Sequence, residues 1–163
     1  MNRLKNVWMM IALFLCLSSC NASASTEGGN DNGLAKQEAP AKGEVIVLNK
    51  VEFLEKVFNY EKHPNEWVYE GSKPCIVDFY ADWCGPCKQV APILRDLAIL
   101  YKKEIIVYKI NVDQEKELAA AFGIQSIPTF LFIPKEGRPM MSMGALPRED
   151  FVNQIDEYLL KKK

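Results

Sequence analysis

The sequence predicts an α/β domain, and two observations carry that prediction. First, the hydrophobic spacing switches repeatedly between short continuous apolar runs, which are typical of strands, and apolar positions three or four residues apart, which are typical of helices. Second, the runs at residues 75–80 (CIVDFY) and 105–110 (IIVYKI) are apolar except for one charged residue each. Strands of that kind belong in the centre of a sheet that helices cover on both faces.

Three pairs, each a strand followed by a helix, come first along the domain. The helix at residues 88–103 contains Pro92, which should kink it. The helix at residues 115–122 is followed by Gly123, a residue typical of helix ends. A polar loop, residues 60–74, separates the first pair from the second. The predicted order is strand 45–48, helix 51–58, strand 75–80, helix 88–103, strand 105–110 and helix 115–122.

A hairpin and a final helix complete the predicted domain. Residues 129–133 (TFLFI) and 139–143 (PMMSM) are two short strand-like runs joined by a turn around Gly137. The last helix, residues 147–160, starts with Pro147, which suits the first turn of a helix.

The N-terminus predicts export. Arg3 and Lys5 precede an uncharged apolar run of eleven residues, 7–17 (VWMMIALFLCL), and no acidic residue occurs before Glu27. That pattern is typical of a secretion signal. Eleven residues form a helix too short to cross about 30 Å of hydrocarbon, which argues against a transmembrane helix.

Residues 17–20 (LSSC) resemble the lipobox of bacterial lipoproteins, whose cysteine is acylated and becomes the new N-terminus. We therefore expect residues 1–19 to be removed and Cys20 to attach the protein to a membrane without spanning it. The protein would then lie in the cell envelope, on the periplasmic side of a bacterial membrane. The alternative is an ordinary signal cut near Ala22 or Ala24, which would release a soluble periplasmic protein.

Residues 20–43 predict a flexible tether that starts with the lipidated cysteine. After Cys20 they contain Leu34 as their only large apolar residue, so they bury too little surface to offset the entropy of ordering. The root-mean-square reach of such a tether is on the order of 25 Å. We expect the folded domain to occupy residues 44–163. Without the signal, 18 basic and 21 acidic residues remain, and a net charge of −3 does not favour nucleic acid as a partner.

Cys84 and Cys87, in the stretch YADWCGPCK, allow three interpretations: a structural disulfide, a metal site or a redox pair. A disulfide that closes so short a loop removes little entropy from the unfolded chain. A zinc site needs four ligands, and the domain offers only His63 and Cys75 besides this pair. The redox interpretation is favoured because the pair follows a buried-type strand and begins an amphipathic helix.

The start of a helix gives the two cysteines different chemistry. Residues three apart lie one turn apart there, close enough for Cys84 and Cys87 to join reversibly. Unpaired backbone N–H groups and the helix dipole stabilise a thiolate on Cys84, which lowers its pKa and makes it the nucleophile. Cys87, one turn further in, should be shielded and react second. This chemistry requires no metal and no cofactor.

The chain resembles the thioredoxin family in four blocks that follow the family's order and spacing. The resemblance covers essentially all of residues 44–163. It implies a thioredoxin fold, with a mixed five-stranded sheet flanked by four helices, and dithiol–disulfide exchange through Cys84 and Cys87. The blocks are residues 75–94 (CIVDFYADWCGPCKQVAPIL), 108–113 (YKINVD), 122–132 (FGIQSIPTFLF) and 143–146 (MGAL).

The resemblance also implies roles for residues near the cysteines. Gly85 and Pro86 match the intervening pair of the reducing members of the family. Asp78 would be a buried carboxylate that helps to remove the proton from Cys87, and Lys109 would be its electrostatic neighbour. The alternatives are that Asp78 is a strand-end acid reaching solvent and that Lys109 extends its amine to solvent.

A surface for docking other proteins is implied around the cysteines. Pro128 matches the family's cis-proline, which faces the disulfide and presents backbone groups to an extended segment of a bound protein. For Met143, packing in the core is an alternative to contact with a partner. The docking residues implied by the resemblance are Trp83, Ile127, Pro128, Met143, Gly144 and Ala145.

Two features fit the family less closely. The loop at residues 60–74 is longer than a minimal thioredoxin needs. We expect a variable loop anchored by one aromatic side chain, with a partner-specific surface around Trp67 as the alternative. Cys75 has no evident partner. We expect it to be a buried inert thiol, and a regulatory or mixed-disulfide role is the alternative.

Together these features predict an exported, membrane-tethered and monomeric thiol–disulfide oxidoreductase that reduces disulfides in other proteins, here called client proteins. Outside the cytoplasm its electrons would have to come from a thiol-relay protein in the membrane. One alternative is a net oxidase or disulfide isomerase that uses the same site. Another is a tethered client-binding module whose redox activity is incidental.

Overall fold

The computed structural model describes residues 44–162. The predicted signal at residues 1–19, the lipidation of Cys20 and the tether at residues 20–43 lie outside the described residues. Among residues 44–162, no helix combines the length and the hydrophobicity needed to cross a bilayer.

A mixed sheet of five strands forms the centre of the domain, in the order β1-β3-β2-β4-β5. The neighbouring strands β1, β3 and β2 run parallel, and β4 and β5 each pair antiparallel to their neighbour. This sheet confirms the fold expected from the sequence. The strands are β1 (Val45–Val47), β2 (Cys75–Tyr80), β3 (Ile106–Asn111), β4 (Thr129–Ile133) and β5 (Met140–Met143).

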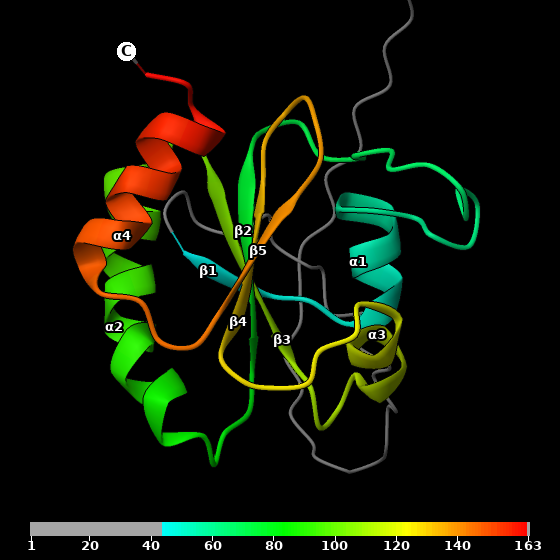
Figure 1. Ribbon diagram of the computed structural model, residues 1–163, viewed down its shortest axis with the longest axis horizontal. Helices are drawn as coiled ribbons and strands as arrows, with labels where there is room; N and C mark the ends of the chain where they lie inside the picture. Colours follow the sequence, from blue (N-terminus) through cyan, green and yellow to red (C-terminus); the bar gives the residue numbers. More distant parts are fainter. Residues whose placement is uncertain (1–43, 163) are drawn as a thin grey trace, which may run out of the picture. The chain divides into compact units, whose positions relative to one another are not determined.

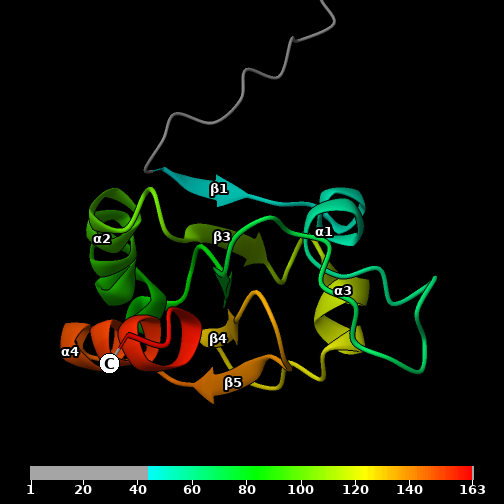
Figure 2. The same ribbon diagram turned by 90° about the horizontal axis from the view of Figure 1, so that it is seen from above.

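Four helices cover the two faces of the sheet. In Figures 1 and 2, α2 and α4 lie on one side of the strands, and α1 and α3 lie on the other. The last helix continues beyond α4 as a π-helical segment. The helices are α1 (Lys50–Lys56), α2 (Gly85–Leu100), α3 (Lys116–Ala121) and α4 (Arg148–Asn153), with the π-helical segment at Gln154–Leu159.

Each face of the sheet has its own apolar core. On the side of α2 and α4, Phe130 of β4 packs edge-on against Phe151 with ring centroids 4.9 Å apart. On the side of α1 and α3, Phe53 packs in the same way against Phe122 at 5.2 Å. Strand β2 contributes to both cores because alternate side chains point to opposite faces, which explains its continuous apolar sequence.

The observed helix ends differ from the predicted ones for local reasons. α2 begins at Gly85, three residues before the predicted start, because Cys84 is its N-cap and Pro86 suits the first turn. Pro147 is the N-cap of α4 and not a member of its first turn. Gly123 has φ +63°, a left-handed conformation that glycine adopts without strain, and it ends α3 as predicted.

The polar loop before β2 is anchored to the domain by aromatic side chains. The backbone of Tyr69 forms an isolated β-bridge with that of Phe58, and the ring centroids of Trp67 and Phe58 lie 4.3 Å apart. These rings pack against the core on the side of α1 and α3. The loop therefore has several aromatic anchors, whereas the sequence predicted one.

Strand β2 leads directly to the region of interest. It is the central strand of the sheet, and the short connection Ala81–Trp83 joins its carboxyl end to the first turn of α2. Sites in open α/β sheets commonly form at the carboxyl ends of the parallel strands. The two cysteines therefore lie at the edge of the sheet where functional groups are expected.

Candidate active site

Cys84 and Cys87 form a disulfide at the start of α2, with their Cα atoms 5.3 Å apart. Cys84 is the N-cap residue, and its Sγ atom accepts a hydrogen bond from the backbone N–H of Cys87 at 3.2 Å. Gly85 and Pro86 lie between them in the first turn, and both are exposed. A sulfur at this position meets the free N–H groups and positive end of the helix, which is the environment that favours a thiolate.

Exposure does not distinguish the two cysteines, since Cys84 is 3% and Cys87 5% exposed. Both cysteines pack in a small cluster with Ala81, and Ile127 packs against that cluster. The difference between the two thiols therefore comes from their positions in the helix, at the N-cap and one turn inside it.

Asp78 lies beneath this region on β2 and is only 5% exposed. Its β2 position pairs with Lys109 of β3 in the parallel register. Burial raises the pKa of Asp78 to about 7, although the nearby Lys109 cation partly opposes that rise. The alternative of a strand-end acid that reaches solvent is therefore wrong.

Lys109 is half-buried, and its ammonium group lies over the ring of Tyr80, 4.7 Å from the ring centroid. A cation in this position is stabilised by the aromatic face. Lys109 therefore interacts with two residues of β2. Its ammonium group lies over the Tyr80 ring, and its positive charge lowers the pKa of Asp78.

A pocket of about 180 Å³ connects Asp78 with Cys87. Lys109 and Ala91 also line it. The carboxyl group and the second cysteine therefore share one small solvent-accessible space, although they come from a strand and a helix.

Trp83 is the most exposed large apolar side chain beside the disulfide, at 70%. Its indole N–H donates a hydrogen bond to Asp113 Oδ2 at 2.8 Å. Asp113 in turn donates its backbone N–H to Asn111 Oδ1 at 3.0 Å, and Asn111 Nδ2 donates to Asp82 Oδ2 at 3.2 Å. These bonds tie the connection before α2 to the end of β3.

No role for Asp82, Asn111 or Asp113 is predicted from the sequence. A signal was present, because Asn111 and Asp113 both belong to the block YKINVD that resembles the family. The bonds themselves depend on two segments about thirty residues apart in the chain, which hydrophobic spacing does not bring together.

The Ile127–Pro128 peptide bond is cis, as the resemblance implied. Gly144 donates its backbone N–H to the Pro128 carbonyl at 2.8 Å and has φ +89°, which favours glycine. Met143 pairs with Thr129 next to this bond and is 67% exposed, so the alternative of core packing is wrong. The structure thus brings the segment around Pro128 beside the one around Gly144, with Ala145 also exposed.

Cys75 lies at the other end of β2 and is fully buried. It is the free cysteine among residues 44–162. Burial raises the pKa of its thiol to about 12, and a hydrogen bond with Tyr69 only partly opposes the rise. At neutral pH it is a protonated thiol without access to solvent.

The described residues do not gather metal ligands, because no three His, Cys, Asp or Glu side chains of residues 44–162 group in a suitable way. The chemistry that the geometry offers is that of a reversible disulfide at a helix start, with a buried carboxyl group of raised pKa that shares a pocket with its second cysteine.

Known proteins match this chain over the same region. The family model Thioredoxin matches residues 45–157. A thioredoxin of Borreliella burgdorferi is 44% identical over 113 residues, which are 69% of this chain and 96% of that protein. A thioredoxin of Haemophilus influenzae is 34% identical over 116 residues, 71% of this chain and 98% of that protein.

A solved structure gives independent support for the fold. A mutant thioredoxin from Halobacterium salinarum aligns with a TM-score of 0.58 and 24% identity, covering 75% of this chain and 96% of that one. The fold, the disulfide in its CGPC sequence and the relatives agree that the site is a thiol–disulfide oxidoreductase site. The chain therefore belongs to the thioredoxin family.

Proposed function

We propose that this oxidoreductase is an exported protein-disulfide reductase, tethered to a membrane through a lipid on Cys20. The observation that carries the proposal is the place of the Cys84–Cys87 pair, at the first turn of α2 with Asp78 sharing a pocket with the second sulfur. The export and the anchor rest on the sequence of residues 1–20 alone.

In the reduced protein, the Cys84 thiolate attacks one sulfur of a client disulfide. A bond forms between Cys84 Sγ and that sulfur, the client's own disulfide bond breaks, and the departing client sulfur leaves as a thiolate that takes a proton from solvent. The helix start stabilises the attacking anion, because the Cys84 sulfur lies where the N–H group of Cys87 points.

Cys87 then resolves the mixed disulfide. Its thiol gives a proton to the Asp78 carboxylate and attacks Cys84 Sγ, so that the Cys84–Cys87 bond forms and the client leaves with its second sulfur reduced. Two electrons pass from the dithiol to the client. A carboxyl group with a pKa of about 7 is a suitable proton acceptor at neutral pH, since it is neither permanently ionised nor permanently neutral.

The exposed residues around the disulfide suit an extended client segment. Trp83 and Met143 offer apolar contacts because they are 70% and 67% exposed. Pro128 itself is buried, and Ile127 before it packs against the disulfide cluster. An extended segment could pair there with the backbone while Trp83 and Met143 contact its side chains.

The direction of electron flow is inferred from the intervening residues. Gly85 and Pro86 are the pair that the reducing members of the family carry, and a reductase outside the cytoplasm must receive electrons from a membrane protein that relays thiols. Client proteins and this donor are therefore the proposed partners, along with the lipid bilayer.

Reduction of insulin disulfides by dithiothreitol tests the activity. We expect the full chain to accelerate the precipitation of the insulin B chain, and the double variant Cys84→Ser/Cys87→Ser to add nothing to dithiothreitol alone. A wild-type protein without effect would contradict the proposal and would favour a binding module.

Fractionation of a bacterium that expresses the full chain tests the anchor. The wild-type protein should sediment with the membranes, and Cys20→Ala should move it to the soluble fraction. Wild-type protein in the soluble fraction would overturn the lipid anchor and leave the redox chemistry unaffected.

A further inference from the structure

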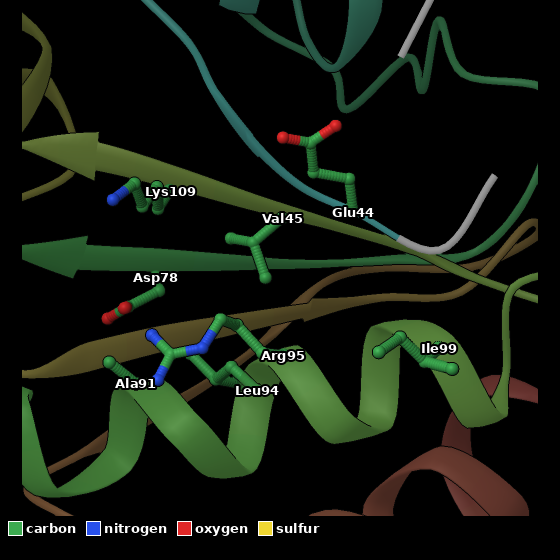
Figure 3. Close-up of a pocket in the computed structure, with 8 residues that line it drawn as sticks. All are labelled: Glu44, Val45, Asp78, Ala91, Leu94, Arg95, Ile99 and Lys109. Atoms are coloured by element: carbon green, nitrogen blue, oxygen red, sulfur yellow. The ribbon is translucent and has the colours of Figure 1, made fainter. Parts of the chain in front are cut away.

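A second pocket, of about 350 Å³, lies beside Asp78 between α2 and the edge of the sheet formed by β1 and β3 (Figure 3). Its walls are largely apolar, and Asp78 is its buried polar group. Its charged neighbours in the pocket lie on three different segments. The lining residues are Glu44, Val45, Asp78, Ala91, Leu94, Arg95, Ile99 and Lys109.

The two pockets meet at Asp78, since both are lined by Asp78, Ala91 and Lys109. The smaller pocket extends to Cys87, and the larger one extends to Arg95. Arg95 lies eight positions after Cys87 on α2, which corresponds to about 12 Å along the helix. The larger pocket therefore extends along α2 away from the helix start that carries Cys84, where a client would be bound.

The Asp78 carboxyl group needs a polar neighbour in the larger pocket. Within residues 44–162 its Oδ1 atom is buried and has no hydrogen-bond partner. A buried carboxylate without a partner is costly, whereas a water molecule that also bonds the charged side chains of the pocket can satisfy it. At about 350 Å³ the pocket has room for several water molecules, since each occupies about 30 Å³ in the liquid.

Arg95 is the second cation of this pocket, besides Lys109, whose charge lowers the pKa of Asp78. Figure 3 shows its guanidinium group extending from α2 across the pocket toward Asp78, while the Glu44 carboxylate at the other end points away. Lys109 lies opposite Asp78 on the neighbouring strand β3. The titratable or charged residues that share the two pockets with Asp78 are Glu44, Tyr80, Asp82, Cys87, Lys88, Arg95 and Lys109.

We propose that Arg95 is a positioning residue of the resolving step, which stabilises the carboxylate form of Asp78 through the pocket between α2 and β1 while a client covers the disulfide. The inference rests on the proposed proton transfer from Cys87 to Asp78. It adds that a pocket lined by a cation adjoins the proton acceptor on the side that the client leaves open.

The variant Arg95→Gln tests this role, because it removes the charge and keeps a polar side chain. Two quantities are measured on the full chain: the midpoint of the Asp78 carboxyl carbon resonance in a pH titration, and the pH profile of client release from the mixed disulfide. Both midpoints should rise by about 0.5 unit, less than the shift caused by a close buried pair, because Arg95 is exposed.

On the acid side of the profile, a rise of that size leaves about threefold fewer carboxylates, so release should slow about threefold. Above pH 9 the rate should match that of the wild type, which a general loss of structure would not allow.

Two further variants serve as controls. Arg95→Lys keeps the cation and should restore most of the wild-type midpoint. Arg148→Gln removes the same charge from an exposed position at the start of α4 and should leave the midpoint unchanged. An unchanged midpoint in Arg95→Gln, or an equal shift in Arg148→Gln, would overturn the inference.

The variant Asp78→Asn separates this inference from the proposed function. If client release in Asp78→Asn keeps the acid limb of the wild-type profile, the proposed proton transfer fails. If that limb disappears in Asp78→Asn but does not move in Arg95→Gln, the proton transfer stands and only the role of Arg95 is overturned.

Discussion

One cysteine begins β2 and another follows its carboxyl end, and the first is a free thiol whereas the second is part of a disulfide. Cys75 begins the strand, is fully buried, and has a thiol whose pKa burial raises to about 12. Cys84 follows the other end of the strand, and it sits at the N-cap of α2, bonded to Cys87. Both cysteines are nearly inaccessible, at 0% and 3% exposure, so burial alone does not decide which thiol reacts.

The local backbone makes the difference. Cys75 is surrounded by apolar side chains and the Tyr69 hydroxyl, which offer an anion little stabilisation. The Cys84 sulfur instead receives an N–H group at the start of a helix and has a second thiol one turn away. A reactive cysteine in this fold is therefore defined by its place relative to a helix N-terminus and a partner thiol.

Serine substitutions of Cys84 and Cys75 should have the most unequal effects on activity. Cys84→Ser removes the nucleophile and should lower insulin reduction by at least roughly 10³-fold. Cys75→Ser should retain activity within about twofold, since that thiol has no part in the exchange. The measurement is the initial rate with dithiothreitol, and a large loss in Cys75→Ser with the fold intact would support a regulatory role for Cys75.

The second buried polar group of β2, Asp78, should show a pH-dependent effect on stability. The pKa of this carboxyl group is about 7 in the fold, against an ordinary value of 3.8. Below pH 4 it is neutral in both states and has no effect. As pH rises from about 4 to 7, the unfolded state ionises first, so stability is lost, by at most about 4 kcal/mol.

At pH 8 the variant Asp78→Asn should therefore be more stable than the wild type, by about 2–4 kcal/mol, whereas at pH 4 the two proteins should be equally stable. Denaturant titrations at the two pH values measure the difference. An equal effect at both pH values would contradict the assigned ionisation of Asp78.

Cys75→Ser gives a matched stability measurement on the same strand. The hydroxyl replaces a buried thiol in an apolar core, and we expect a cost of about 1–3 kcal/mol in the free energy of unfolding. This cost should be the same at pH 4 and pH 8, because the Cys75 thiol is protonated in both states across that range. A pH-dependent cost would show that Cys75 is coupled to a group that titrates.

The smallest expected change in stability is that of a substitution at Trp83, which lies beside the disulfide. Trp83→Phe removes the hydrogen bond to Asp113 and keeps an aromatic ring. Because the side chain is exposed, the free energy of unfolding should fall by only about 0.5 kcal/mol, whereas the Michaelis constant for a protein client should rise. A client affinity that does not change would remove Trp83 from the docking surface.

Much of the fold follows from the sequence because each strand and helix has a clear hydrophobic period. The ends of β2 and β4 are those that the apolar runs predicted, since a buried strand ends where its apolar run ends. The start of α2 was placed three residues late, because Cys84, Gly85 and Pro86 have no helical hydrophobic pattern and are recognised only by their capping positions.

The candidate site was only partly predictable. Its cysteines form a local motif, and the cis peptide at Pro128 followed only from the resemblance. The Trp83–Asp113 hydrogen bond and the pocket between Asp78 and Arg95 join segments far apart in the chain, so no local pattern contains them. The hydrogen bond depends on the register of β2 and β3, and the pocket depends on how α2 packs against the sheet.

The reduction potential of the Cys84–Cys87 pair tests the proposed direction of electron flow most directly. The full chain would be equilibrated with graded thiol buffers, and the oxidised fraction measured by alkylation and mass. We expect a value near the thioredoxin value of about −270 mV, which makes the dithiol a reductant of client proteins. A value near about −120 mV, that of a strong periplasmic oxidant, would contradict the reductase and reverse the flow of electrons.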